Sequence, residues 1–183
     1  ADPEVVIQSE FATPTISNNV PDEDGKMLNI EHVVPQSWFL KKLPMKGDMH
    51  HLFYCEIKCN SFRGNKNYHD FPDYKPENPR ESRIVEQCGM GETNEFEPEY
   101  GKGMVARATL YFLVRYPGKI LNEFKNEIDI PLLLKWHNEF PPTSEFEKHR
   151  NQAIFDLQGN RNPFIDFPEI ASNVDFSSIN EVH

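Results

Sequence analysis

A carboxylate and an imidazole stand side by side in residues 29–39, which read NIEHVVPQSWF, where Glu31 precedes His32. Two further groups that can bind a cation or a phosphate follow at Asn60 and Arg63. Hydrolysis of a phosphate diester needs a base that is neutral near pH 7, which imidazole provides. It also uses a hard cation on oxygen ligands, and a guanidinium can hold the phosphate through paired hydrogen bonds. These residues therefore indicate metal-assisted phosphodiester chemistry.

A short series of elements would bring these groups together. Residues 27–34 mix Leu, Ile and paired Val before Pro35, which is typical of a strand that stops where proline lacks the ladder donor. After a basic loop, residues 51–55 have β character, and residues 60–67 form a polar segment of helix size. A histidine at the end of the first strand then faces an amide at the start of the helix across a hairpin, with room for a metal and a phosphate.

The rest of the chain divides into an arm, an insertion and a helical part. Residues 1–26 carry prolines and an acidic run, so we expect an irregular arm with at most a short strand at residues 4–7. Residues 69–103 are rich in Pro, Gly, Asn and Glu and are predicted to be a long loop or an insertion. Residues 104–170 are predicted to be helical. The expected helices run from Met104 to the break at Pro117 and Gly118, over residues 131–140, and from an S-x-x-E capping box at Ser144 to Gly159.

The composition supports a folded chain with an uneven charge. The 183 residues include 14 Phe, 6 Tyr and 2 Trp, and we expect Trp38, Trp136, Phe146 and Phe164 to lie in the core. A net charge of -10 argues at first against nucleic acid, since neutralising phosphate dominates such binding. Residues 26–75, however, hold eight Lys and Arg against five Asp and Glu. A basic face on an acidic body is therefore possible, and we expect binding there to be sensitive to salt.

The sequence also bears on whether the protein crosses a membrane and whether it is exported. The longest uninterrupted apolar run, residues 110–114, is far shorter than the about 20 residues that span a bilayer, so no transmembrane helix is expected. The first residues have neither a basic nor an apolar leader segment, so we expect that any signal peptide has been removed. The cysteines Cys55, Cys59 and Cys88 permit one disulfide and one free thiol, and the sequence does not decide the pairing.

Four ordered blocks resemble those of the bacterial endonuclease I family, and they extend over roughly residues 27–168. They read NIEHVVPQSWF, GDMHHLFYCEIKCNSFRGN, FEPEYGKGMVARATLYFLVRY and LLKWHNEFPPTSEFEKHRNQAIFDLQGNRNPFID. The resemblance implies an α+β fold in which a ββα-metal (His-Me) finger, about residues 27–68, is embedded in a mainly helical single domain of residues 27–183. It also implies a nonspecific nuclease that is secreted or periplasmic.

The resemblance assigns the central roles residue by residue. His32 matches the histidine that acts as general base in the family's E-H-(I/V)-(V/F)-P block. Glu31 matches a carboxylate that helps to hold the metal, and Asn60 matches the asparagine whose side-chain oxygen binds it. The implied cofactor is Mg²⁺, with Mn²⁺ or Ca²⁺ able to replace it. The implied substrates are DNA and RNA, bound through the phosphate backbone and cut to 5′-phosphate ends by a monomer with no obligate protein partner and no membrane.

Four more residues are assigned in the same way. Arg63 and Asn65 match the arginine and second asparagine of an N-x-x-R-x-N run, where both are expected to support the site or the phosphate. Arg63 is counted among the catalytic groups, and Asn65 among the supporting ones. His50 matches the family's D-L-H-x-L motif, with a supporting role. Arg161 lies in the Q-G-N-R-N-P-F-I-D signature and is expected to approach the substrate or brace the site.

The chain departs from the family pattern at one helix start, and two other functions stay open. Met104 replaces an aspartate, so a helix cap is lost and Gly103 or water must substitute. One alternative is a binding module without catalysis, built on Cys55, Cys59, Cys88 and a histidine and stabilised by zinc or by a disulfide. Only the Cys55-x₃-Cys59 spacing fits a zinc site. The other is a family member that binds nucleic acid but does not cut it.

Overall fold

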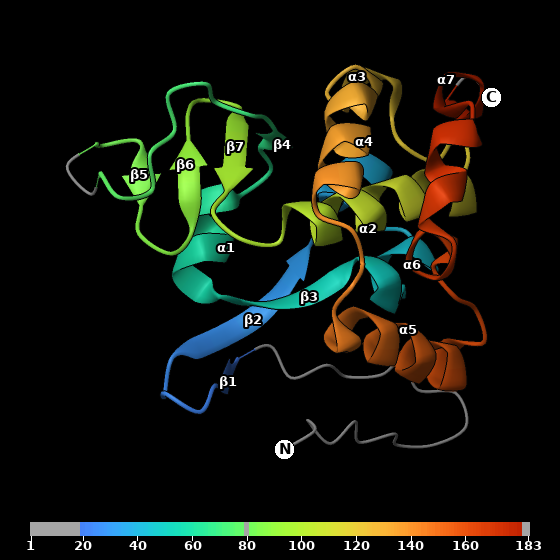
Figure 1. Ribbon diagram of the computed structural model, residues 1–183, viewed down its shortest axis with the longest axis horizontal. Coiled ribbons are helices and arrows are strands. Elements are labelled where there is room, and N and C mark those ends of the chain that lie inside the picture. Colours follow the sequence, from blue (N-terminus) through green and yellow to red (C-terminus); the bar gives the residue numbers. More distant parts are fainter. Residues whose placement is uncertain (1–18, 79–80, 181–183) are drawn as a thin grey trace.

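Two small sheets and a set of helices make up the computed structural model, which describes residues 19–78 and 81–180 (Figure 1). The elements are, in chain order, β1 (Val20–Pro21), β2 (Met27–His32), η1 (Gln36–Phe39), η2 (Met45–Gly47), η3 (Met49–His51), β3 (Leu52–Glu56), α1 (Ile57–Arg63), β4 (Asn67–Tyr68), β5 (Ile84–Val85), β6 (Gly89–Gly91), β7 (Glu95–Pro98), α2 (Lys102–Arg115), α3 (Asn122–Lys125), α4 (Ile130–Glu139), α5 (Glu145–Gln158), α6 (Pro163–Asp166), η4 (Pro168–Asn173) and α7 (Phe176–Asn180). The mixed α+β class expected from the sequence is confirmed.

The first sheet carries the predicted strand, strand and helix in that order. Strands β1, β2 and β3 pair antiparallel, with Glu31 opposite Phe53 and His32 opposite Leu52. Helix α1 follows β3 without a loop, so the helix predicted at residues 60–67 begins three residues earlier and ends at Arg63. The prediction of its start was wrong because no turn residue separates strand from helix. Asn60 therefore lies inside α1 rather than at its first residue.

The N-terminal arm can be compared with the structure only in its last part. The short strand expected at residues 4–7 lies outside the described residues. Strand β1 pairs Val20 with Leu28, so the end of the arm belongs to the first sheet.

A second sheet occupies most of the segment that the sequence predicted as a long loop or an insertion, so the prediction of a loop was wrong. Its strand order is β4-β7-β6-β5, with β4 and β7 parallel and the other pairs antiparallel. The strands have only two to four residues, too few for a periodic pattern to register. Gly89 is required at its tightest point, because φ is +137° and a Cβ would lie 2.0 Å from the Glu97 carbonyl oxygen.

The helices gather on the other side of the molecule, and α2 runs through the middle of them (Figure 1). Its buried side chains join those of α4 and of η1 in one core that includes Trp38, Leu110, Phe112 and Trp136. Helix α2 begins at Lys102 after Gly101 at φ +79°, without a side-chain cap. The expected start at Met104, with Gly103 as substitute cap, was therefore wrong. Instead, Gly103 permits close packing, because a Cβ there would lie 2.2 Å from the Phe140 carbonyl oxygen.

The helix caps and core aromatics agree with the sequence in part. Ser144 accepts a hydrogen bond from the Glu147 backbone at 3.3 Å, which confirms the predicted cap of α5. Of the four expected core aromatics, Phe146 is 61% exposed, while Trp38, Trp136 and Phe164 are buried as predicted. Within the described residues no helix is long and apolar enough to cross a membrane.

Candidate active site

The hairpin of β2 and β3, helix α1 and the second sheet enclose a pocket of about 290 Å³ that holds three of the predicted residues. Glu31, Asn60 and Arg63 line it together with Phe53 and Cys55. Side chains opposite one another in an antiparallel pair lie on the same face of the sheet. The pairing of Glu31 with Phe53 therefore turns the carboxylate toward α1 and into this pocket.

The carboxamide of Asn60 is held in one orientation. Its Nδ2 donates to Asn29 Oδ1 at 2.7 Å and to the Ile30 carbonyl at 3.1 Å. Both amide protons are thereby used on β2, and within the described part of the chain no protein donor contacts Oδ1. The amide oxygen is left as an unused acceptor in the residue that lines the pocket with Glu31.

Arg63 is buried and holds the end of β2. Nη1 donates to Glu31 Oε1 at 2.7 Å and to the His32 carbonyl at 3.0 Å, and Nη2 donates to the Val33 carbonyl at 2.7 Å. Its side chain is only 5% exposed. Burial raises the pKa of Glu31 above its ordinary value, and the charge of Arg63 opposes that rise. The Arg63 guanidinium therefore fixes both the carboxylate of Glu31 and the backbone of His32, the predicted base.

His32 lies on the opposite face of the strand, outside the residues that line this pocket in the described structure. Its Nε2 lies 3.0 Å from the Lys46 carbonyl oxygen and its Nδ1 lies 3.2 Å from Gln36 Nε2. A carbonyl can only accept, so Nε2 carries the proton and Nδ1 has the free electron pair. Burial lowers the pKa of His32 below its ordinary value, which keeps the ring neutral.

The other predicted residues lie elsewhere. His50 is buried, donates through Nε2 to the Asn160 carbonyl at 2.9 Å and packs on Tyr111. Arg161 binds both oxygens of Asp166, at 2.7 and 2.8 Å. Asn65 is exposed in the turn after α1. The structure therefore brings Glu31, Asn60 and Arg63 together, with His32 next to them, and does not bring His50, Asn65 or Arg161 into that pocket.

Asp48 fixes the segment before β3 through its hydrogen bonds, and the sequence analysis gave this residue no role of its own. Its buried carboxylate accepts from Tyr111 and Tyr116 at 2.7 Å each, from Gln158 at 2.8 Å and from the His50 backbone at 3.0 Å. Burial raises its pKa, but these donors outweigh burial and hold the pKa below the ordinary value. The network ties η3, and with it β3, to the helices. An aspartate within the block that carries the site was the available signal.

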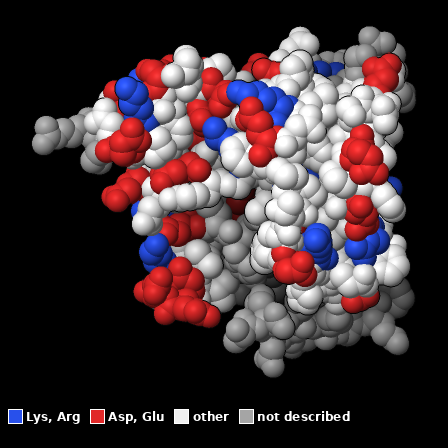
Figure 2. Space-filling model, viewed as in Figure 1, with Lys and Arg blue, Asp and Glu red and all other residues white. Residues whose placement is uncertain are grey.

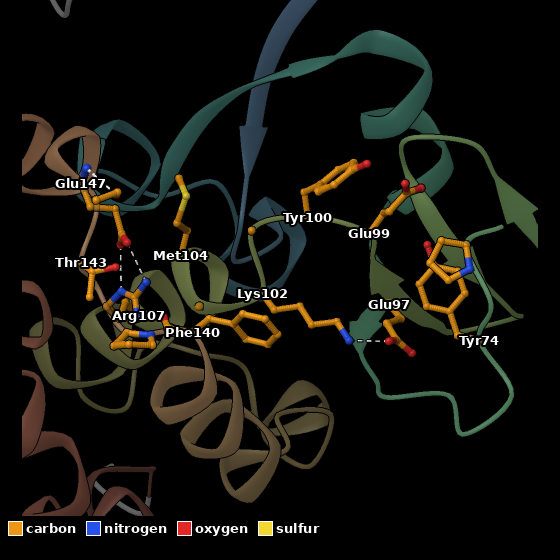
Figure 3. Close-up of a pocket in the computed structure, with 15 residues that line it drawn as sticks. Tyr74, Glu97, Glu99, Tyr100, Lys102, Met104, Arg107, Phe140, Thr143 and Glu147 are labelled. Atoms are coloured by element: carbon orange, nitrogen blue, oxygen red, sulfur yellow. Dashed lines mark hydrogen bonds and ion pairs between the residues drawn. The ribbon is translucent and has the colours of Figure 1, made fainter.

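A larger pocket of about 560 Å³ lies beyond Tyr100 and Met104, which also line the first pocket (Figure 3). Two ion pairs lie in its wall: Lys102 binds Glu97 at 2.5 Å, and Arg107 binds Glu147 at 2.7 Å. None of the predicted site residues lines it. The face in Figure 2 is hollowed between the two halves of the molecule, and acidic side chains gather along its left side.

The residues on the pocket wall suit a hard divalent cation. A carboxylate and an amide oxygen, with the remaining positions left to water, are ligands that Mg²⁺ prefers. A zinc site is a poorer fit, because Cys59 and Cys88 form a disulfide with a Cα–Cα distance of 5.0 Å and only Cys55 remains a thiol. Within the described residues no three His, Cys, Asp or Glu side chains are grouped to bind a metal. The Cys59–Cys88 bridge settles the pairing that the sequence left open.

Fold and site together define a small α+β protein whose candidate site is built on a strand–strand–helix unit. The family model of endonuclease I matches residues 4–169, and the chain belongs to the endonuclease I family. An extracellular ribonuclease of Bacillus amyloliquefaciens is 35% identical over 141 residues, which are 69% of this chain and 46% of that protein. Among deoxyribonucleases of Aeromonas hydrophila, an extracellular one is 31% identical (67% of this chain, 50% of that protein) and a periplasmic one 30% (67% and 48%). The chain thus spans about half the length of the curated relatives it matches.

Proposed function

We propose that the chain is a metal-dependent endonuclease that hydrolyses phosphodiester bonds of DNA and RNA with little sequence preference. Family membership supports the reaction class. The relatives named ribonuclease and deoxyribonuclease support both substrates. The resemblance described above supports 5′-phosphate ends. Extracellular and periplasmic relatives, together with a disulfide, support an exported protein.

The observation that carries the proposal is the fixed orientation of the Asn60 amide. Asn29 and the Ile30 carbonyl hold both of its protons, so Oδ1 and the Glu31 carboxylate present oxygens in the same pocket. These two residues would hold Mg²⁺, and Mn²⁺ or Ca²⁺ could replace it. A divalent cation bound there supplies positive charge to the phosphoryl oxygens and the leaving oxygen.

The chain's own residues supply the proton transfer. His32 accepts a proton from the attacking water at Nδ1, because Nε2–H is held by the Lys46 carbonyl. The substrate phosphate lies across the end of β2, between Glu31 and His32, and the Gln36 amide moves off Nδ1 when water binds. Arg63 acts here as a positioning residue through its contacts to Glu31 and to the His32 carbonyl. A direct contact of Arg63 or Arg161 with the phosphate stays a prediction that their present partners do not favour.

The test is incubation of supercoiled plasmid and of RNA with wild-type protein, His32→Ala and Asn60→Ala, each with Mg²⁺ and with excess EDTA. We expect only the wild type with Mg²⁺ to degrade both substrates. His149→Ala is the matched control, because this histidine is exposed on α5, and it should behave as wild type. If the wild type with Mg²⁺ retards DNA on a gel but leaves it intact, the alternative of a catalytically silent binding protein replaces the proposal.

A further inference from the structure

One loop beside His32 differs in charge from the rest of this acidic chain. Residues 36–47 contain three lysines, Lys41, Lys42 and Lys46, and neither aspartate nor glutamate, whereas the whole chain has a net charge of -10. All three lysines are exposed. Across residues 19–78 and 81–180, none of them takes part in an ion pair. Positive charge that the protein does not neutralise itself is available for an anionic partner.

Buried side chains anchor this loop in the core, and its other side chains are exposed to solvent. Trp38, Phe39 and Met45 are buried to 5% exposure or less, whereas Leu40 and Leu43 are 55% and 61% exposed. This alternation holds the base of the loop in the core and leaves its outer side to solvent.

The backbone at the tip has an uncommon conformation. Leu40 and Lys41 have φ of 57° and 55°, a region that side chains other than glycine rarely occupy. Backbone hydrogen bonds hold it there, from Lys41 N to the Gln36 carbonyl at 2.9 Å and from Lys42 N to the Phe39 carbonyl at 3.2 Å. Such costly conformations persist where the surrounding structure fixes them, and they occur often at functional sites.

The loop also touches the proposed base at both ends. Gln36 contacts His32 Nδ1, and the Lys46 carbonyl contacts His32 Nε2. We infer that this loop is the docking surface for the phosphate backbone of the nucleic-acid substrate, with Lys41 and Lys42 holding phosphates next to the one that is cleaved. The exposed leucines lie beside the sugars and bases of the same strand. This inference rests on the proposed function.

The test compares Lys41→Gln/Lys42→Gln with Lys75→Gln/Lys148→Gln, a control that removes the same charge from two other exposed lysines. Binding of a short fluorescent DNA duplex is measured in EDTA over a range of salt concentrations. Each lost phosphate contact makes the slope of log K against log salt shallower by about 0.9, so the loop variant should lose about 1.8. When the salt concentration is lowered from 1 M to 0.1 M, the affinity of wild type should therefore rise about 60-fold more than that of the loop variant. The control should keep the wild-type slope.

Hydrolysis of bis(p-nitrophenyl) phosphate with Mg²⁺ separates this inference from the proposed function, since so small an ester does not reach the two lysines. The loop variant should hydrolyse it at the wild-type rate while degrading plasmid more slowly at low substrate concentration. A wild type that cleaves neither substrate refutes the proposed function. A wild type that cleaves both, with a loop variant of unchanged salt slope, refutes the docking surface alone. If the loop variant loses only binding to phosphatidylserine vesicles, the loop contacts anionic membranes and the inference is wrong.

Discussion

Removal of the Cys59–Cys88 disulfide should lower the stability of the protein by an amount that its position predicts. The bridge joins α1 to the segment between β5 and β6 across a sequence separation of 29 residues. Closing a loop of that length removes about 12 cal/mol/K of entropy from the unfolded chain, or about 3.6 kcal/mol at 25 °C. Cys59→Ser/Cys88→Ser should therefore lose about 3 to 4 kcal/mol of the free energy of unfolding.

The measurement is urea unfolding of the double variant and of wild type at one pH, followed by tryptophan fluorescence. Cys55→Ser is the control, because it alters a cysteine that forms no disulfide. The variant should also need more Mg²⁺ for full activity, since Cys59 directly precedes Asn60 and the bridge holds this part of α1 against the second sheet. A loss of stability below about 1 kcal/mol, with an unchanged dependence on urea, would show that the unfolded chain is already compact and that the entropy argument fails.

Three further predictions concern other contacts. Arg107→Met leaves the buried Glu147 carboxylate without its partner and should cost about 3 to 5 kcal/mol in urea unfolding; a loss under about 1 kcal/mol would contradict this. Burial lowers the pKa of His51 from 6.5 to about 4. As the pH falls, His51 is therefore protonated in the unfolded chain before it is protonated in the folded one. Stability should therefore drop by roughly 3 kcal/mol between pH 6.5 and 4, and His51→Gln should flatten that part of the curve. Asn29→Ala removes one of the two hydrogen bonds that orient the Asn60 amide and should reduce activity about 10- to 100-fold with a higher Mg²⁺ requirement, while unchanged activity would remove Asn29 from the site.

The residues proposed to carry the chemistry could be predicted from the sequence because they follow one another along a short strand–strand–helix segment. Glu31 precedes the base directly, and Asn60 and Arg63 lie on one helix, so local order was enough to place them together. The pairing of Asn60 with Asn29 could not be predicted in the same way. It depends on the register between β2 and α1, which the packing of side chains decides.

The second sheet escaped prediction for a different physical reason. Its parallel pair, β4 and β7, and the bridge from Cys88 to α1 join residues that are far apart in sequence. Its two antiparallel pairs are local, but their strands are too short to show a pattern. Local composition in residues 69–103 reports only the many turns between these strands. The capping box at Ser144 failed in part for a related reason, because Glu147 binds Arg107 across the core instead of returning to its own helix start.

Because α2 is buried, hydrogen exchange of its amides can serve as a reference against which local motions elsewhere in the protein are measured. Nine of the fourteen residues of this helix are buried, and the residues that share its core range from Val34 to Phe176. Amide protons in its middle can therefore exchange with deuterium only when the whole molecule opens. Their exchange rate reports the global free energy of unfolding, whereas amides at the tip of the loop at residues 36–47 report local opening. Comparing the two in one experiment separates mobility beside His32 from the stability of the fold.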